Sequence, residues 1–304
     1  MPAFQHMSRI LPFVVSITVI LAMVSGLQAS VRDLDYPKEG LRALEPTELS
    51  FQLDATFENP DDPGEIEVLA TVTEPDGNTY DVPGFHYQDF SVNYHQRRIE
   101  KAGDPFWKVR WTPRQVGRHQ LLIRVAVDGA SSEEVAHATV SVEPASEEAG
   151  GFIGIDPGNP SYFSYDRTGR TFWPMGYNLF HLNWPPFGFY KPGARGPKFG
   201  GVLKPTLFDS IYEHGEVTPE ARFEVFDALM GRLRKTASSG ATALRIRLDS
   251  WWQALEIYPG ATIADPALAD TVERIKALYP VGRYDPFSAW IADQLLSFAE
   301  ERQM

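Results

Sequence analysis

Residues 172–184 read FWPMGYNLFHLNW, an apolar run that ends in polar and aromatic side chains. Such a run is typical of a strand in a parallel sheet, because the body of the strand is buried and its carboxyl end carries ligand-binding groups. We therefore predict that this stretch forms the first strand of a parallel α/β barrel. The side chains of Asn178, His181 and Asn183 at its polar end are expected to face a ligand.

The chain after this stretch continues the same pattern. A helix is expected from Thr218, which can cap it, because Pro219 suits the first turn and apolar residues then recur at three- and four-residue steps. Residues 243–248 read ALRIRL and predict a second strand, and a second helix should begin at Asp285. Strand, helix, strand and helix indicate a parallel repeat. About 150 residues remain from residue 152, whereas a full barrel needs about 250, so we expect an incomplete barrel over 152–304.

The first half of the chain has the period of antiparallel strands. Segments 49–57, 65–73, 107–111, 119–127 and 135–142 are rich in alternating apolar residues and are separated by turn-forming clusters. We predict an immunoglobulin-like β-sandwich over residues 40–143, followed by a flexible linker at 144–151.

Residues 1–29 have the layout of a cleaved signal peptide. Arg9 precedes an apolar run, and small residues follow as far as Ala29. We expect the protein to be secreted or periplasmic, with no membrane attachment after cleavage.

Composition narrows the classes of partner. The net charge is −12, and an acidic chain repels phosphate backbones, so nucleic acid is not an expected partner. The chain contains no cysteine, which excludes disulfides, thiolate metal sites and lipid anchors on cysteine. The histidines at 86, 95, 119 and 137 lack metal-ligand spacing, and no phosphate-loop or zinc-protease motif occurs. We expect neither a metal nor a cofactor, and the oligomeric state is left open.

Two parts of the sequence resemble a known family. Residues 107–119, WKVRWTPRQVGRH, resemble the immunoglobulin-like domain of unknown function that precedes the catalytic barrel in many bacterial glycoside hydrolases. Residues 172–178, 244–246 with the following tryptophan pair, 284–286 and 299–302 together resemble the first two βα units of a retaining glycoside hydrolase barrel. That clan includes cellulases, mannanases and β-galactosidases. The resemblance implies a β-linked poly- or oligosaccharide as the partner, and it matches Arg245 to a strand-two arginine that supports the nucleophile.

Several side chains at the expected strand ends are candidates for sugar binding. They are Asn178, His181, Asn183, Trp184, Arg245, Asp249, Trp251 and Trp252. Amides, imidazoles and carboxylates suit sugar hydroxyls, and tryptophan rings suit stacking. Capping of strand ends is the alternative for the polar residues, and packing beneath a loop is the alternative for one tryptophan of the adjacent pair. Trp107 and Trp111 alternate with a valine on one strand, so we interpret them as core residues.

No catalytic residue is assigned. The resemblance places the acid/base after an asparagine on strand four and the nucleophile on strand seven, and the sequence contains no Asn-Glu pair. Glycoside hydrolysis by this route needs two suitably spaced carboxyl groups. We therefore expect this chain to be a truncated piece of a secreted glycoside hydrolase, and to be inactive by itself. The alternative is a non-catalytic carbohydrate-binding or cell-surface interaction protein.

Overall fold

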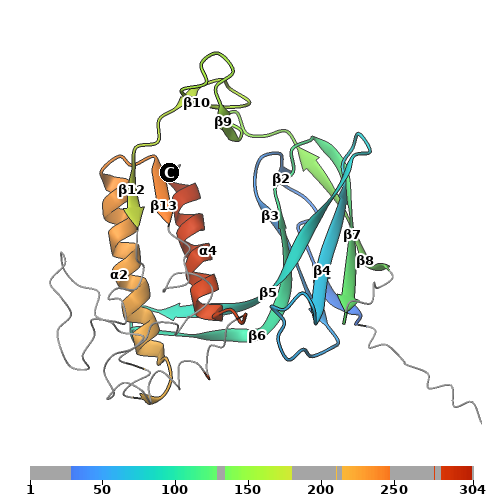
Figure 1. Ribbon diagram of the computed structural model, residues 1–304, viewed down its shortest axis with the longest axis vertical. Coiled ribbons are helices and arrows are strands. Elements are labelled where there is room, and N and C mark those ends of the chain that lie inside the picture. The colour runs from blue at the N-terminus through green and yellow to red at the C-terminus, as the bar shows by residue number, and fades with distance from the viewer. Residues whose placement is uncertain are drawn as a thin grey trace, which may run out of the picture.

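The computed structural model describes residues 29–128, 134–179, 210, 214–246, 277 and 282–302. Within them, eight strands form one continuous sheet in the order β1-β3-β6-β5-β4-β7-β8-β2 (Figure 1). The strands are β1 (Val31–Asp35), β2 (Leu41–Arg42), β3 (Thr47–Leu53), β4 (Ile66–Thr73), β5 (Thr79–Asn93), β6 (Arg98–Trp111), β7 (Gly117–Val127) and β8 (Glu134–Glu143). Neighbours are antiparallel, except that β2 runs parallel to β8.

The predicted immunoglobulin-like sandwich is wrong as a fold class. A sandwich has two sheets that face each other, whereas here β5 pairs with β4 as far as Pro83 and with β6 from Gly84 onward. One strand therefore joins both halves into a single sheet. Pro83 has no N–H with which to continue the first ladder. At Gly84 an added Cβ would lie 2.5 Å from Val68 Cγ1, so only glycine allows this close approach.

The sheet curls, so that β1 contacts β8 and the inward-facing side chains form a closed core. We call this the sheet core. Successive side chains of a strand point to opposite faces of the sheet, so burial alternates along each strand. On β3 the side chains of Leu49, Phe51 and Leu53 are buried, and those between them are half-buried. Burial of each such side chain contributes about 1.5–3 kcal/mol. The alternation predicted from the sequence is thus confirmed strand by strand, although the assembly of the strands is not.

Strands β5 and β6 continue beyond the sheet as a two-stranded arm, residues 87–106. Tyr87 pairs with Phe106 but Asp89 pairs with Ala102, so β6 carries a bulge at residues 103–105. Gly103 has a φ of +67°, a left-handed conformation that glycine adopts without strain. The buried amide of Gln88 donates to the carbonyl of Gly103 at 3.2 Å and so fills the gap in the ladder. The bulge lets the arm bend away from the sheet toward the helices (Figure 1).

Two helices are described, and the sequence signals for both are confirmed. Helix α2 (Pro219–Ser238) begins after Thr218, whose side chain accepts a hydrogen bond from the Ala221 N–H. Helix α4 (Pro286–Glu301) begins after Asp285, whose carboxylate accepts from the Ser288 N–H at 2.9 Å. Proline in the first turn suits each start, because the first N–H groups have no partner within the helix.

A second core lies between the arm and the two helices, and we call it the arm core. The Phe90 ring centroid is 5.5 Å from that of Phe287 and 5.7 Å from that of Trp290. Phe226 of α2 meets Trp290 at 5.2 Å, so the arm and both helices share one aromatic cluster. Figure 1 shows α2 and α4 side by side with the arm beneath their lower ends.

The predicted parallel pairing is confirmed, but the (β/α)8 barrel is wrong as a fold class. Strands β12 (Gly176–Leu179) and β13 (Ala243–Ile246) pair in parallel, with Asn178 opposite Arg245. Across the described ranges they form a two-stranded sheet with only α2 and α4 as helices, and most of the regular structure is β. The helices bury their apolar faces against the antiparallel arm rather than against a ring of parallel strands. A further three-stranded sheet contains β9 (Ile153–Ile155), β10 (Phe163–Tyr165) and β11 (Thr171–Phe172).

Candidate functional site

A cleft of about 390 Å³ lies between strands β4 and β5 and the first half of helix α4, and we call it the α4 cleft. Its size falls within the range of small-molecule sites. It is lined by Pro60, Asp61, Pro63, Ile66, Glu67, Val68, Leu69, Pro83, Gly84, Phe85, His86, Tyr87, Gln88, Trp107, Tyr284, Pro286, Ala289, Ala292 and Asp293.

The floor of the cleft is apolar and aromatic. Gly84 lets β5 lie tightly against Val68 of β4, which sets the depth of the floor. His86 and Trp107 are register partners on β5 and β6, and their rings meet edge to face with centroids 5.6 Å apart. The Trp107 ring also meets Phe57 edge to face at 6.4 Å, so its orientation is fixed from two sides.

One side of the cleft is formed by two loops that hydrogen-bond to each other, and we call residues 58–64 and 282–285 the rim loops. The Tyr284 N–H donates to Asp61 Oδ2 at 3.0 Å, and Asn59 Nδ2 donates to the Gly282 carbonyl at 2.8 Å. The Arg283 guanidinium donates to the carbonyl of Glu58. These contacts join segments more than 200 residues apart in the chain, because Asn59 and Gly282 are separated by 223 positions. The rim therefore depends on both the sheet and α4.

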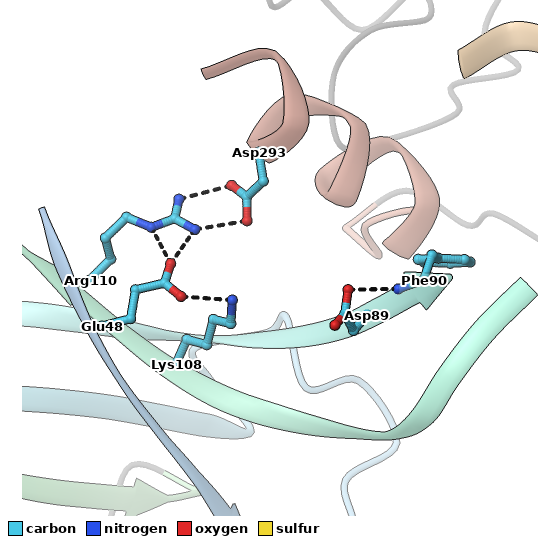
Figure 2. Close-up of polar contacts among 6 residues, drawn as sticks. All are labelled: Glu48, Asp89, Phe90, Lys108, Arg110 and Asp293. Carbon is cyan, nitrogen blue, oxygen red and sulfur yellow. Dashed lines mark hydrogen bonds and ion pairs between the residues drawn. The ribbon is translucent and has the colours of Figure 1, made fainter. Parts of the chain in front are cut away.

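The wall of the cleft also includes Asp293 of α4, which belongs to a network of charged side chains whose other members do not line the cleft (Figure 2). Arg110 of β6 makes a bidentate contact with Asp293 of α4, with N–O distances of 2.8 and 2.7 Å. Arg110 Nε also donates to Glu48 Oε1 at 2.6 Å, and Lys108 Nζ donates to Glu48 Oε2 at 2.8 Å. Such planar double contacts are the strongest ion-pair geometry available to arginine. The network attaches α4 to the sheet and holds the Asp293 carboxylate at the cleft.

Tyr87 connects this wall to the arm. Its side chain is buried, it hydrogen-bonds to Asp293, and Lys108 Nζ lies 3.9 Å from its ring centroid. Burial, followed by the charge of Asp293, raises the pKa of Tyr87 above its ordinary value, so the phenol stays neutral. Farther along the arm, Asp89 accepts from the Phe90 N–H at 2.8 Å, as Figure 2 also shows.

Asp61 and His86, two further titratable groups that line the cleft, have shifted pKa values. Burial raises the pKa of Asp61, although the Tyr284 N–H and the charges of His86 and Arg283 oppose this shift. Burial lowers the pKa of His86, and the charge of Asp61 opposes that shift. The imidazole is therefore neutral at neutral pH and can both donate and accept a hydrogen bond. The cleft thus offers a neutral ring and a half-buried carboxylate above an aromatic floor.

The described residues contain no cluster of three or more His, Asp or Glu side chains that could hold a metal ion. What the cleft provides is apolar surface and hydrogen-bonding groups. This combination binds ligands that have both apolar faces and hydroxyl or amino groups.

The structure describes two of the sequence-predicted site residues. Asn178 and Arg245 are opposite each other on β12 and β13, and the Arg245 side chain is exposed rather than enclosed in a barrel. Neither residue lines the α4 cleft. The remaining candidates fall outside the described residues: His181, Asn183, Trp184, Asp249, Trp251 and Trp252.

The residues of the cleft were not predicted as a site. Trp107 was interpreted as a core residue, and it is buried as expected, yet one side of it lines the cleft. His86 carries no motif, and Asp61 belongs to a segment that predicts only a turn. One sequence signal could have pointed to Asp61: Pro60 and Pro63 stand on either side of it and indicate a rigid exposed loop. Loops carry functional residues more often than cores do.

Comparison with known proteins gives little support for any family. No family model matches the chain, and no curated protein matches it. Among solved structures, a putative glycoside hydrolase from Bacteroides vulgatus ATCC 8482 aligns over 87% of this chain and 40% of its own, with 15% sequence identity and a TM-score of 0.47. This chain therefore spans less than half the length of that protein.

A second solved structure, a conjugative transposon lipoprotein from Bacteroides eggerthii DSM 20697, aligns over 37% of this chain and 94% of its own, with 10% identity and a TM-score of 0.20. At these scores neither likeness supports an inference about activity, so the cleft is interpreted from its own geometry. Within the described ranges, the helices are too short or too polar to cross a membrane.

Proposed function

We propose that this chain is the glycan-binding part of an exported carbohydrate-active protein, and that the α4 cleft holds a segment of a β-linked poly- or oligosaccharide. The observation that supports this most is the pairing of an aromatic floor with polar groups at the rim. Sugar rings present flat C–H faces that stack on aromatic rings, and equatorial hydroxyls that need hydrogen-bond partners. Tyr284, which is 43% exposed, supplies the first kind of surface above a floor that includes the buried Trp107, and Asp61 with His86 supplies the second.

The rim adds an accessible aromatic side chain. Tyr284 is 43% exposed at the edge of the cleft, directly beside the Asp61 carboxylate that its own N–H contacts. A ligand segment that leaves the cleft would pass over this ring. Because the volume is at the lower end of the range for ligand sites, we expect the cleft to take one portion of a longer glycan rather than enclose it.

The proposed role needs no catalytic group. The sequence resemblance to glycoside hydrolases suggests the substrate class, and export is suggested by residues 1–29. Hydrolytic inactivity of this chain stays a prediction, which a test for new reducing ends after incubation with β-linked glycans would check.

Binding can be measured by isothermal titration calorimetry with neutral β-linked glucose and mannose oligosaccharides. We expect Tyr284→Ala to weaken binding about fivefold or more, equivalent to ~1 kcal/mol, because a stacking surface is lost. Trp173→Ala is the matched control, since Trp173 is 58% exposed but does not line the cleft. The proposal fails if no oligosaccharide binds, or if Trp173→Ala weakens binding and Tyr284→Ala does not.

A further inference from the structure

We propose that the α4 cleft selects neutral saccharides and rejects saccharides that carry carboxylates, such as uronic acids. This inference rests on the proposed function and adds the chemical class of the ligand. It is carried by the charges at the cleft. The charged side chains that line it are Asp61, Glu67 and Asp293, from three different elements, and none of the described residues lining it is a lysine or an arginine.

The cations closest to the wall are already engaged. Both terminal nitrogens of Arg110 bind the Asp293 carboxylate, and its Nε binds Glu48. The Lys108 ammonium binds Glu48 and lies over the Tyr87 ring. An anionic ligand would have to compete with these contacts for a partner, and taking Arg110 would leave Asp293 without its cation.

The cation at the rim, Arg283, is held on the rim loops by a neutral carbonyl and keeps its positive charge, which acts on Asp61. Arg283 donates to the Glu58 carbonyl, which fixes its guanidinium on the rim loops, and it does not line the cleft. His86 does not supply a positive charge, because it is a neutral ring in this half-buried position. A carboxylate in the cleft would therefore meet Asp61 and Glu67, which have no ion-pair partner within 4 Å among the described residues, and Asp293, whose charge Arg110 already pairs, while no lysine or arginine lines the cleft.

Asp61 gives the same cleft a preference for hydroxyl groups. Its Oδ2 accepts the Tyr284 N–H, and its Oδ1 has no partner among the described residues. A carboxylate oxygen accepts a hydroxyl in a charge-assisted hydrogen bond, which is shorter and stronger than a neutral one. Partial burial strengthens both this attraction and the repulsion of an anion, since the local dielectric is lower than in water. The same atom thus favours neutral sugars and disfavours acidic ones.

The experiment compares two probes by titration calorimetry at neutral pH: a β-linked glucose tetrasaccharide, and the same tetrasaccharide with its primary hydroxyls oxidised to carboxylates. We expect the oxidised probe to bind at least about tenfold more weakly, because unpaired like charges are placed together. Asp61→Asn should narrow this difference, since the amide keeps an acceptor for Tyr284 and removes the charge.

Asp62→Asn is the matched control. Asp62 lies on the same loop, is exposed, accepts from the Gly64 N–H at 2.8 Å and does not line the cleft. The two variants change the net charge equally, so a difference between them isolates the local effect from the overall charge of −12. Added salt should also narrow the difference in the unmodified protein, which tests the inference without any variant.

The outcomes are distinct. Equal binding of both probes, or stronger binding of the oxidised one, overturns the selectivity while leaving glycan binding in place. Equal effects of Asp61→Asn and Asp62→Asn overturn the role of Asp61. Absence of binding by either probe overturns the proposed function, and this inference with it.

Discussion

The sheet core and the arm core are built in opposite ways. The sheet core comes from strands that are close in sequence and alternate regularly, as in β3 and β4. The arm core joins side chains far apart in the chain, such as Phe90 with Trp290. The arm, however, is a covalent extension of two sheet strands. The arm core therefore depends on the sheet, because the helices pack against an arm that the sheet strands extend. The sheet core contains no helix residue, so it does not depend on the helices in the same way.

The largest expected effects come from removing one phenylalanine in each core. Phe51 is 1% exposed in the sheet core and Phe90 is 6% exposed in the arm core. Each change to alanine should lower the free energy of unfolding by about 3–5 kcal/mol. Phe51→Ala should weaken strand and helix signals together, whereas Phe90→Ala should lower the helical circular dichroism signal first.

Thermal unfolding followed by circular dichroism at separate wavelengths for helix and for strand would distinguish these outcomes. If Phe90→Ala destabilised both signals equally, the two cores would form one cooperative unit and the asymmetry would be wrong. The domain boundary predicted at residues 144–151 remains a prediction, and the same data bear on it.

A smaller effect is expected from the ion pair that attaches α4 to the sheet. Arg110→Met leaves Asp293 without its cation, whereas Glu48 keeps Lys108, and removing one partner of a buried pair costs about 3–5 kcal/mol. The Arg110 side chain is 35% exposed, so solvent screening should reduce the loss in the free energy of unfolding to about 1–3 kcal/mol.

A double-mutant cycle with Asp293→Asn measures the coupling directly. In urea denaturation, the double variant should lose less free energy of unfolding than the sum of the losses of the two single variants. Simple additivity would mean that this contact does not hold the helix in place.

Two glycines should respond to alanine with opposite signs. Gly103 forms the bulge of the arm with φ of +67°, and an added Cβ would meet no atom within 4 Å, so its change to alanine is a purely conformational cost of about 1 kcal/mol. Gly231 is inside α2, and its added Cβ also meets open space, so alanine there should stabilise by about 1 kcal/mol. An unchanged free energy of unfolding in the Gly231→Ala variant, measured by urea denaturation, would show that α2 does not contribute to the cooperative fold.

The smallest effect concerns pH and the buried cap of α4. Burial raises the pKa of Asp285 above the ordinary value, against hydrogen bonds from Ser288 and the charge of Arg222. A raised folded-state pKa contributes stability that is complete below the unfolded pKa of about 3.9 and is lost as pH rises through the folded pKa. An asparagine caps a helix as well as an aspartate does but carries no charge. The Asp285→Asn variant should therefore become more stable relative to the unmodified protein as the pH rises from the unfolded pKa of Asp285 through its folded pKa. A constant difference across pH would contradict this.

Local structure could be predicted well from the sequence, whereas the assembly could not. The alternation in 49–57 and 65–73 and the caps at Thr218 and Asp285 are short-range signals, and they match the observed elements. Pro83, Gly84 and Pro105 look like strand ends, so the full lengths of β5 and β6 were missed. Those residues are where β5 changes partner and where the arm bends, and these features depend on neighbours distant in sequence.

The site was harder to predict for the same reason. The expected residues were sought at the carboxyl ends of two parallel strands, where barrel enzymes place them. The α4 cleft instead takes Asp61 from a loop, His86 and Trp107 from two antiparallel strands and Tyr284 from the start of a helix. No short motif can combine four segments spread over more than 200 residues. Strand pairing joins His86 to Trp107, and the hydrogen bonds between the rim loops bring Asp61 and Tyr284 together.

Hydrogen–deuterium exchange can show directly whether a neutral glycan binds in the α4 cleft. The exchange of the intact chain is compared with and without a neutral β-linked oligosaccharide. We expect slower amide exchange in peptides covering residues 58–69, 83–88 and 283–293, which are three of the four segments that line the cleft. Peptides covering residues 153–173, which carry the exposed aromatic side chains of Tyr162 and Trp173, should be unchanged. Protection confined to residues 153–173, or to none of these peptides, would contradict the account.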